Sequence, residues 1–159
     1  MTAYVAVVGA GVAGEDLARV GEDVGRGLGE RGAVVLCGGL SGVMEAVCRG
    51  CRAGGGTTVG LLPGKDRKKA NPFVDIALAT DMGEMRNALI VRAADVVVAL
   101  GGEYGTLSEV AFALKIGRPV VGYETWELSK RGAFDDGIVR VSSATDAVAE
   151  ALRLAGAPT

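Results

Sequence analysis

Short apolar runs rich in valine recur along the 159-residue chain, and most are continuous rather than alternating. They lie at 4–8, 33–37, 58–62, 75–79, 95–100, 119–123 and 138–141. A strand with one face in water alternates apolar and polar residues, whereas a continuous apolar strand is buried on both faces. The pattern therefore predicts a parallel sheet of about six or seven strands with helices on both faces.

Segments with helical periodicity separate these runs. Residues 15–30 place Leu17, Val20, Val24 and Leu28 on one stripe. Further helices are expected at 42–53, 83–94, 106–116 and 144–154. Strand and helix alternate throughout, which is typical of a Rossmann-like, doubly wound α/β fold with right-handed crossovers.

Two glycines interrupt the apolar stripe of the first predicted helix. Gly21 and Gly25 lie inside residues 15–30, where a glycine costs about 1 kcal/mol relative to alanine. A helix tolerates this loss of stability where the missing side chain lets another element pack closely against it. We expect these two glycines to allow close contact between the helix and the sheet.

Three glycine-rich turns follow predicted strands. They are VAVVGAGVAG at 5–14, CGGLSG at 37–42 and GGEYGT at 101–106. In doubly wound sheets a ligand binds at the carboxyl ends of the strands, near the point where the strand order reverses. Any ligand site should therefore be assembled from these turns.

The first turn contains a formal GxGxxG at Gly9, Gly11 and Gly14. A nicotinamide dinucleotide site also needs an acidic residue about 20 positions later, at the end of the second strand. Cys37 and Gly38 stand there instead. The turn is more simply explained as a tight connection between strand and helix, with Gly9 and Gly11 bordering the pocket of a different ligand.

The second turn brings Gly38 and Gly39 after a strand and Gly42 at the start of a helix. Glycines let backbone N–H groups approach an anion, and a helix N-terminus adds its positive end. The alternative is a flexible turn in which Ser41 caps the helix. Both readings stay open, and Gly38, Gly39 and Gly42 are candidate pocket residues.

The third turn places Gly101, Gly102 and Gly105 after the most apolar strand, and Thr106 is expected to open a helix. Backbone amides and the Thr106 hydroxyl form a candidate cradle for one phosphate. It is not a Walker A loop, because no lysine precedes Thr106. The alternative is a capping box, in which Glu109 serves only the helix start.

Composition excludes several kinds of chemistry. The chain has no histidine and a net charge of −2, so it offers no histidine base or ligand and no strong attraction for nucleic acid or anionic membranes. Cys37, Cys48 and Cys51 are an odd number and are expected to be buried thiols rather than disulfides. We expect no metal site, and one domain spanning 1–159.

Three segments resemble the Lonely-Guy (LOG) family, formerly labelled lysine-decarboxylase-like. GGEYGTLSE at 101–109 is similar to the family motif PGGxGTxxE, and CGGLSGVMEAV at 37–47 is similar to GGxxGxMxAV. Arg86 precedes the first motif by the spacing of the arginine in the family's MHxRK segment. The resemblance covers about residues 5–126. ALKIGRPV at 113–120 is most similar to a short bacterial branch and to molybdenum cofactor carrier proteins.

The resemblance implies a function. Enzymes of this family hydrolyse the N-glycosidic bond of nucleoside 5′-monophosphates, and they release a free base and ribose 5-phosphate. By this resemblance Arg86 and Glu109 form the catalytic pair. The 5′-phosphate would be held by Gly101, Gly102, Gly105 and Thr106. No cofactor is required; the candidate ligands are a nucleoside monophosphate, phosphate or the molybdenum cofactor.

The chain also departs from the family pattern. Gly101 replaces the proline of PGG, and Glu103 replaces a glycine. The segment that matches MHxRK reads GEMRN at 83–87, without histidine or lysine. These changes motivate an alternative, a non-enzymatic carrier or sensor of molybdenum cofactor or a related phosphorylated ligand.

The expected partners are a small phosphorylated ligand and further copies of the chain, without nucleic acid or membrane. The helix at 83–94 is apolar on more than one side through Met85, Leu89, Ile90 and Val91, which predicts packing in a homodimer or larger homo-oligomer. The chain shows neither a secretion signal nor a run of about 18 apolar residues. We therefore expect a cytoplasmic protein.

Overall fold

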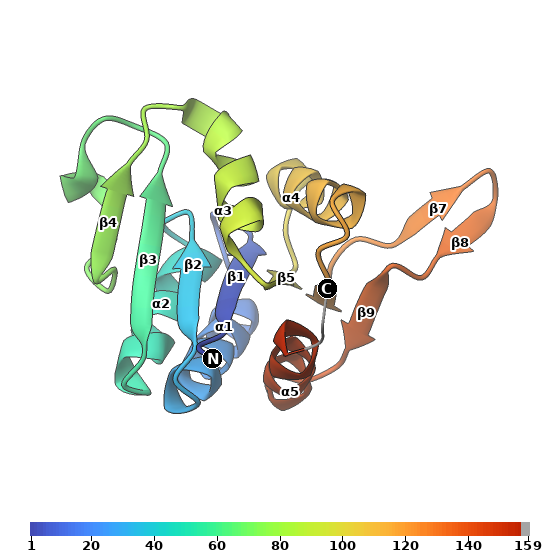
Figure 1. Ribbon diagram of the computed structural model, residues 1–159, viewed down its shortest axis with the longest axis horizontal. Helices are drawn as coiled ribbons and strands as arrows, with labels where there is room; N and C mark the ends of the chain where they lie inside the picture. Colours follow the sequence, from blue (N-terminus) through green and yellow to red (C-terminus); the bar gives the residue numbers. More distant parts are fainter. Residues whose placement is uncertain (157–159) are drawn as a thin grey trace.

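A computed structural model describes residues 1–156 of the chain. Its centre is a parallel sheet of seven strands in the order β4-β3-β2-β1-β5-β6-β9 (Figure 1). The strands are β1 (Tyr4–Gly9), β2 (Val34–Cys37), β3 (Thr57–Leu62), β4 (Ile76–Ala79), β5 (Val96–Leu100), β6 (Val120–Tyr123) and β9 (Ile138–Val141). Each apolar run of the sequence forms one of them, which confirms the predicted sheet.

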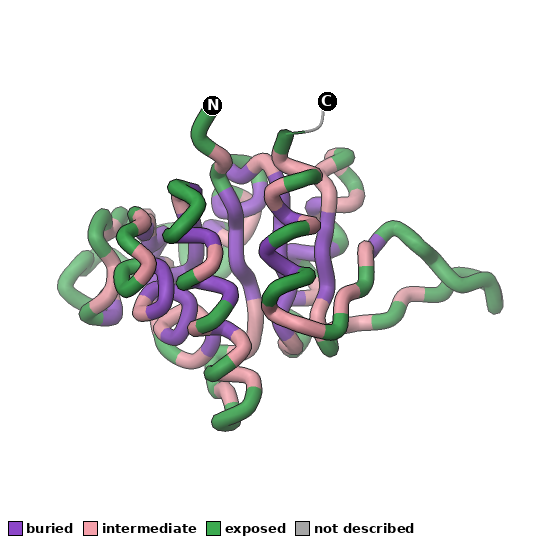
Figure 2. Tube along the Cα trace, turned by 90° about the horizontal axis from the view of Figure 1, so that it is seen from below, coloured by how far each residue is buried: buried purple, intermediate pink, exposed green. Residues whose placement is uncertain are grey.

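Helices cover both faces of this sheet, as the doubly wound prediction requires. One face carries α1 (Glu15–Glu30), α2 (Val43–Ala53) and α5 (Ala144–Ala155), and the other carries α3 (Asn87–Ala93) and α4 (Tyr104–Lys115). Buried residues concentrate along the strands between these layers (Figure 2). None of the helices within residues 1–156 has both the length and the apolar composition that crossing a membrane requires.

The order of the strands defines where a ligand can bind. The chain builds outward from β1 through β2 and β3 to β4, and then returns to place β5 on the other side of β1. Gly9 at the end of β1 is in register with Leu100 at the end of β5. The connection from β1 to α1 and the connection from β5 to α4 diverge at this point, which opens a crevice beyond the carboxyl ends of the strands.

The glycines of α1 contact a helix more closely than the sheet, although a Cβ atom on Gly21 would also lie 3.9 Å from Leu100 of β5. A Cβ atom on Gly25 would lie 2.1 Å from the carbonyl oxygen of Val47 in α2, and the nearest neighbour of Gly21 is Ala46 in α2. The expectation of a close contact was right, but the partner is α2. Two helix backbones approach here more closely than any side chain at Gly25 would allow.

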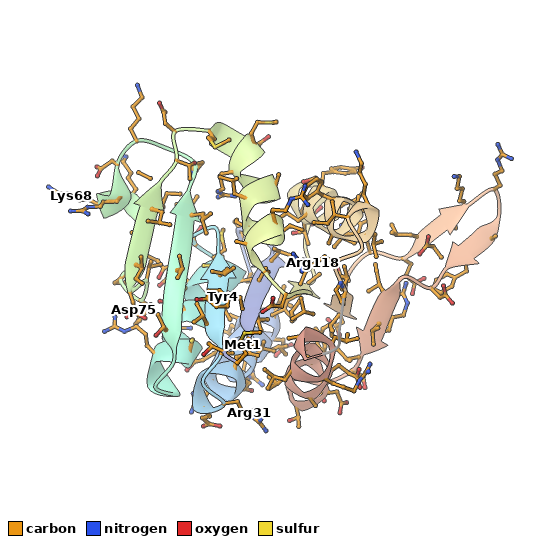
Figure 3. All side chains as sticks on the ribbon, in the orientation of Figure 1. Met1, Tyr4, Arg31, Lys68, Asp75 and Arg118 are labelled. Atoms are coloured by element: carbon orange, nitrogen blue, oxygen red, sulfur yellow. The ribbon has the colours of Figure 1, made fainter. Side chains whose placement is uncertain are left out.

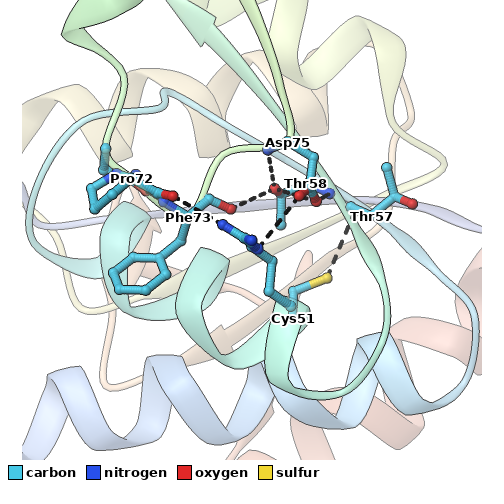
Figure 4. A network of polar contacts seen from close by, with 8 residues as sticks. Cys51, Thr57, Thr58, Pro72, Phe73 and Asp75 are labelled. Atoms are coloured by element: carbon cyan, nitrogen blue, oxygen red, sulfur yellow. Dashed lines mark hydrogen bonds and ion pairs between the residues drawn. The ribbon is translucent and has the colours of Figure 1, made fainter.

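The connection between β3 and β4 is fixed by a partly exposed polar network around Asp75 (Figure 4). The hydroxyl of Thr58 lies 2.9 Å from the Asp75 carboxylate and 2.9 Å from the Phe73 carbonyl oxygen, and the Thr58 N–H donates to Asp75. Arg52 of α2 forms an ion pair with Asp75 at 3.5 Å. Edge strand β4 is thereby held in register with β3.

A short 3-10 turn, η1 (Arg67–Lys69), lies within the same connection. The charged run 65–69 around it is exposed, and Lys68 extends away from the sheet (Figure 3). The run therefore forms a solvated loop.

The predicted helix at 83–94 is divided into two parts. A 3-10 turn, η2 (Gly83–Arg86), precedes α3. Asp81 does not cap this segment, because Asp81 has a φ of 54° and its carboxylate faces Lys65 at 3.8 Å. Met82 precedes η2 without a side-chain cap. The left-handed backbone at Asp81 turns its side chain away from the helix start.

A two-stranded hairpin extends from the body of the molecule (Figure 1). It consists of β7 (Leu128–Lys130) and β8 (Ala133–Asp135), which pair antiparallel. The sequence analysis did not predict it. Each strand is three residues long, which is too short for an alternating pattern to be recognised.

Candidate functional site

A pocket of about 370 Å³ opens at the switch point between β1 and β5. Its floor is formed by the ends of β1 and β2, and its walls come from α2, η2, α3 and α4. The polar side chains that line it are Glu84, Arg86, Asn87, Thr106 and Glu109. The structure therefore brings Arg86 and Glu109 of the predicted catalytic pair to one cavity.

The predicted glycines divide into two groups. Gly9, Gly11, Gly38 and Gly105 line the pocket. The glycines that do not line it are Gly39, Gly42, Gly101 and Gly102. The second group shapes the turns around the pocket instead of forming its surface.

Gly101 and Gly102 have conformations that only glycine adopts readily. Their φ angles are 58° and 102°, and a Cβ atom on Gly102 would lie 2.3 Å from Oγ1 of Thr106. The N–H of Gly101 donates to the Tyr123 carbonyl at 2.9 Å, so this amide is already used. Gly101 and Gly102 thus place the start of α4, and the Gly101 amide is not free to bind a ligand.

α4 begins at Tyr104, two residues before the position expected from the sequence. Its N-cap is Glu103, which makes no side-chain cap bond, and the first helical bond runs from Leu107 N–H to the Glu103 carbonyl. The capping box between Thr106 and Glu109 is therefore absent. Within residues 1–156 the N–H groups of Tyr104, Gly105 and Thr106 have no backbone partner, so they point their partial positive charge beyond the helix end.

The second turn packs against the first. The N-cap of α2 is Gly42, with a φ of 67°, and Ser41 is not the cap. The Ser41 hydroxyl donates to the Gly11 carbonyl at 2.9 Å, and a Cβ on Gly42 would lie 2.3 Å from the Ala10 carbonyl oxygen. Ser41 serves to join the two turns, which fixes one wall of the pocket.

The first turn is a poor phosphate site in this structure. Gly14 is the N-cap of α1, and the first turn of that helix carries Glu15 and Asp16. Two carboxylates at a helix start repel a phosphate group. This observation agrees with the missing acidic residue after β2 in arguing against a dinucleotide at Gly9–Gly14.

Arg86 is 9% exposed and reaches the pocket from the last position of η2. Its guanidinium donates to Asn87 Oδ1 and, at 3.5 Å, to the Gly38 carbonyl, while Nε is buried without a partner in the described part of the chain. Burial lowers the pKa of Arg86, although a guanidinium remains charged in proteins. A buried cation with an unpaired donor is the kind of group that an anion can neutralise.

Glu109 is 7% exposed and faces the same pocket from α4. Burial raises the pKa of Glu109 to about 7, and the positive charge of Arg86 opposes that shift. No hydrogen bond or ion pair within residues 1–156 joins Arg86 to Glu109 directly. Both side chains line the same pocket. Arg86 is held there by its hydrogen bonds to Asn87 and Gly38.

The three cysteines are buried free thiols, as expected. Cys37 Sγ lies 3.5 Å from Cys48 Sγ and accepts the Gly39 N–H at 3.3 Å. These hydrogen bonds lower the pKa of Cys37 and raise that of Cys48. No group of three or more Cys, Asp, Glu or His within residues 1–156 is arranged to hold a metal ion.

The sequence analysis missed several residues of the pocket. Glu84 and Asn87 flank Arg86, and Leu40, Met44 and Pro63 supply apolar surface. The signal for the polar pair was their place in the GEMRN segment, where the chain departs from the family pattern. The apolar residues lie after β2, in α2 and after β3, so only the strand order brings them together.

The fold and the pocket define a class: a doubly wound α/β protein with a polar crevice at its switch point, entered by a helix N-terminus and a buried arginine. Residues 2–149 match the SLOG cluster4 family, and the chain belongs to that family.

Two relatives illustrate the range of the likeness. A protein of Archaeoglobus fulgidus, described only as uncharacterized, is 46% identical over 73% of this chain and 76% of its own length. A probable cytokinin riboside 5′-monophosphate phosphoribohydrolase of Oryza sativa subsp. japonica is 37% identical over 48% of this chain. That match spans 35% of the rice protein.

A solved structure extends the likeness over nearly the whole chain. The molybdenum cofactor binding protein of the phototrophic bacterium Rippkaea orientalis is 31% identical, with a TM-score of 0.84. The match covers 96% of each chain. These comparisons confirm the resemblance to the LOG and molybdenum cofactor carrier proteins that the motifs at 37–47 and 101–109 suggested.

Proposed function

We propose that the chain binds a small ligand carrying one phosphate group, with a nucleoside 5′-monophosphate as the leading candidate. One observation carries this proposal. The unpaired amides at the start of α4 and the unpartnered Nε of buried Arg86 belong to the same pocket region. Both are donors without acceptors, and a phosphate supplies acceptors and the compensating charge.

The size of the pocket fits this ligand class. Its volume of about 370 Å³ lies near the lower end of small-molecule pockets, about 300–1,000 Å³. Thr106 follows β5 and Pro63 follows β3, and these strands are separated by β1 and β2. Three strand spacings correspond to roughly 14 Å, which accommodates a phosphate, a ribose and a base in line.

The chemistry we propose for this site is hydrolysis of the N-glycosidic bond. The bond between C1′ and the base nitrogen breaks, its electron pair leaves with the base, and positive charge develops on the ribose. Glu109 as a carboxylate stabilises that charge and accepts a proton from the attacking water, whose oxygen bonds to C1′. A proton passes to the base, and the products are free base and ribose 5-phosphate.

Two of the departures from the family motif, Gly101 and Glu103, do not line the pocket. Two others, Glu84 and Asn87, line it beside Arg86. Arg86 and Glu109 themselves are retained. Glu103 is exposed, and its carbonyl accepts the Trp126 indole N–H at 3.1 Å. The similarity to the rice phosphoribohydrolase over 79 residues gives the activity further support.

A second candidate function is a carrier of the molybdenum cofactor as cargo. It is favoured by the 31% identity and whole-chain superposition with a molybdenum cofactor binding protein. The same donors, at the start of α4 and on Arg86, would hold the phosphate of that cargo. In this function Glu109 would do no chemistry, and the cargo would leave the pocket unchanged.

Incubation with nucleoside 5′-monophosphates separates these functions. Purified protein is given AMP, GMP, CMP, UMP and a cytokinin ribotide in turn, and free base is measured by chromatography. The hydrolase proposal expects base release from at least one member and loss of release in Glu109→Gln. Release that is equal in wild type and Glu109→Gln for every member would exclude the hydrolase, and a pterin copurified with the protein would favour the carrier.

We also propose that a second copy of the chain covers the open part of the sheet. Ile76 and Leu78 on β4 are 49% and 48% exposed, and they stand in register beside Val59 and Leu61 on the face that α3 and α4 cover elsewhere. Met85, next to this face, is 72% exposed. Parallel strands are normally buried on both faces, so this region favours a homo-oligomer.

A further inference from the structure

The pocket contains two polar side chains that the proposed hydrolysis does not use. Glu84 lies on η2, and Asn87 is the first residue of α3. They are three residues apart, which places them on one face of the helical segment, and both line the pocket beside Arg86. Because they replace the histidine and lysine of the MHxRK pattern, they change which ligand groups the pocket accepts.

The amide of Asn87 has a defined orientation. Arg86 donates a hydrogen bond to Asn87 Oδ1, and a guanidinium has only donors, so the amide oxygen must face Arg86. The amide nitrogen Nδ2 makes no hydrogen bond with residues 1–156. Asn87 therefore has an unpaired donor at the lining of the pocket, and a carbonyl-type oxygen is the acceptor that it suits.

Glu84 offers the opposite kind of group. Its side chain is exposed at the rim of the pocket, and it forms neither a hydrogen bond nor an ion pair with the described residues. An ionised carboxylate has two oxygens that only accept. Together, Asn87 presents one hydrogen-bond donor to the pocket and Glu84 presents two acceptors.

We propose that Glu84 and Asn87 recognise the edge of a 2-amino-4-oxopyrimidine ring, the group that guanine and pterins share. This edge presents a carbonyl oxygen, a ring N–H and an exocyclic amino group in succession. The carbonyl accepts from Asn87 Nδ2, and the ring N–H and the amino group donate to the two oxygens of Glu84. The inference rests on the proposed function, since it assumes a phosphate held at the start of α4.

The strand order supports this placement of the ring. The phosphate donors belong to the β5 side of the pocket, whereas Leu40, Met44 and Pro63 lie on the side of β2 and β3. These three apolar side chains offer surface for a flat ring, which gains stability by leaving water. Glu84 and Asn87 then meet the edge of that ring.

The same two residues disfavour adenine. At the equivalent edge adenine presents an amino donor and an unprotonated ring nitrogen. The amino group would face the donor of Asn87, and the ring nitrogen would face the carboxylate of Glu84. Each mismatched pair forfeits a hydrogen bond that guanine would make, so the pocket should discriminate between the two purines.

The test measures equilibrium binding by calorimetry with GMP, IMP, AMP and the phosphate ester of 6-hydroxymethylpterin. All proteins carry Glu109→Gln, which prevents turnover during the titration. GMP or the pterin ester is expected to bind at least about tenfold more tightly than AMP, because two hydrogen bonds to a charged group are gained. IMP lacks the amino group and should lie between GMP and AMP.

Glu84→Gln should remove this preference by weakening GMP and the pterin ester and by strengthening AMP, whose ring nitrogen can accept from the new amide, while Glu15→Gln, at an exposed site on α1, should keep it. Whichever of GMP and the pterin ester binds with higher affinity identifies the natural ring as guanine or as a pterin. Equal affinities for GMP, AMP and the pterin ester, all lost in Arg86→Ala, would overturn this inference and leave the phosphate site standing. Absence of binding for all four ligands would overturn both.

Discussion

At the scale of single residues, the proposed function depends on Glu109 and Arg86. Both are buried against the pocket, and both have pKa values shifted by burial toward their neutral forms. A carboxyl group whose pKa is about 7 exchanges its proton near neutral pH, which suits a group that accepts and returns a proton during catalysis. The unpaired Nε of Arg86 suits the binding of the anion.

The pKa of Glu109 predicts how activity depends on pH. The carboxylate is the form that accepts a proton, so kcat/KM for nucleotide hydrolysis should rise with pH and level off above about 7. Initial rates between about pH 5.5 and 8.5 measure this profile. A profile that is flat across this range in an active enzyme would exclude Glu109 as the proton acceptor.

The same pKa predicts an effect on stability. The folded state holds the Glu109 proton up to about pH 7, whereas the ordinary value of 4.5 applies after unfolding. Between these values the folded state binds more protons, so its stability is fully present below the lower value and decreases as pH rises. The free energy of unfolding should fall by up to about 3 kcal/mol across this window.

Urea denaturation of wild type and Glu109→Gln at several pH values checks this decrease. The difference between the two proteins isolates Glu109 from the other carboxylates, and it should grow in favour of Glu109→Gln as the pH rises. A difference that does not change between about pH 5 and 8 would mean that the Glu109 carboxyl keeps its ordinary pKa.

At the scale of elements, the contact between α1 and α2 depends on glycine. A Cβ atom on Gly50 would lie 1.9 Å from the Glu22 carbonyl oxygen, and one on Gly25 would lie 2.1 Å from that of Val47. The neighbouring atoms belong to backbone and cannot rotate away. The spacing between the helices, and through α2 the wall of the pocket, is thus set by residues without side chains.

Gly50→Ala is expected to destabilise the protein by at least about 1–3 kcal/mol, because the helices must move apart. Gly64→Ala is the matched control, since a Cβ atom there meets nothing within 4 Å. Denaturant midpoints of the two variants provide the comparison. Equal stability of Gly50→Ala and Gly64→Ala would contradict the close packing of α1 on α2.

The elements also define what the sequence could predict. The strands of the large sheet were found because each has a continuous apolar run, which a buried strand needs and which edge strand β4 also has although Ile76 and Leu78 are about half exposed. The caps considered as alternatives at Ser41 and Thr106 are absent, because each depends on backbone conformations set by tertiary contacts. Ser41, for example, bonds to the Gly11 carbonyl of another turn.

The site shows the same division between local and distant information. Arg86 and Glu109 were found from motif spacing, and the pocket contains both. Leu40 and Pro63 carry no local signal, because they become neighbours only through the order of the strands. Glu84 and Asn87 were visible as departures from a pattern, but their role required knowing that they face the same cavity as Arg86.

At the scale of the whole molecule, the open apolar face beside β4 predicts self-association. Met85→Lys places a charge on this face and should convert a homo-oligomer to a monomer, as measured by light scattering during size-exclusion chromatography. Val12→Lys is the control, because Val12 is 92% exposed and lies away from β4 in the loop after β1. A wild-type protein that is monomeric at all concentrations would contradict the proposed assembly.

In the function proposed above, the pocket at the switch point of the sheet takes one phosphorylated ligand. The most direct test is a crystal structure of the protein with ribose 5-phosphate. The account predicts that the phosphate accepts hydrogen bonds from the N–H groups of Tyr104, Gly105 and Thr106 and from Arg86, with C1 of the sugar facing Glu109. A phosphate bound instead at the start of α1, beside Gly14, would contradict it.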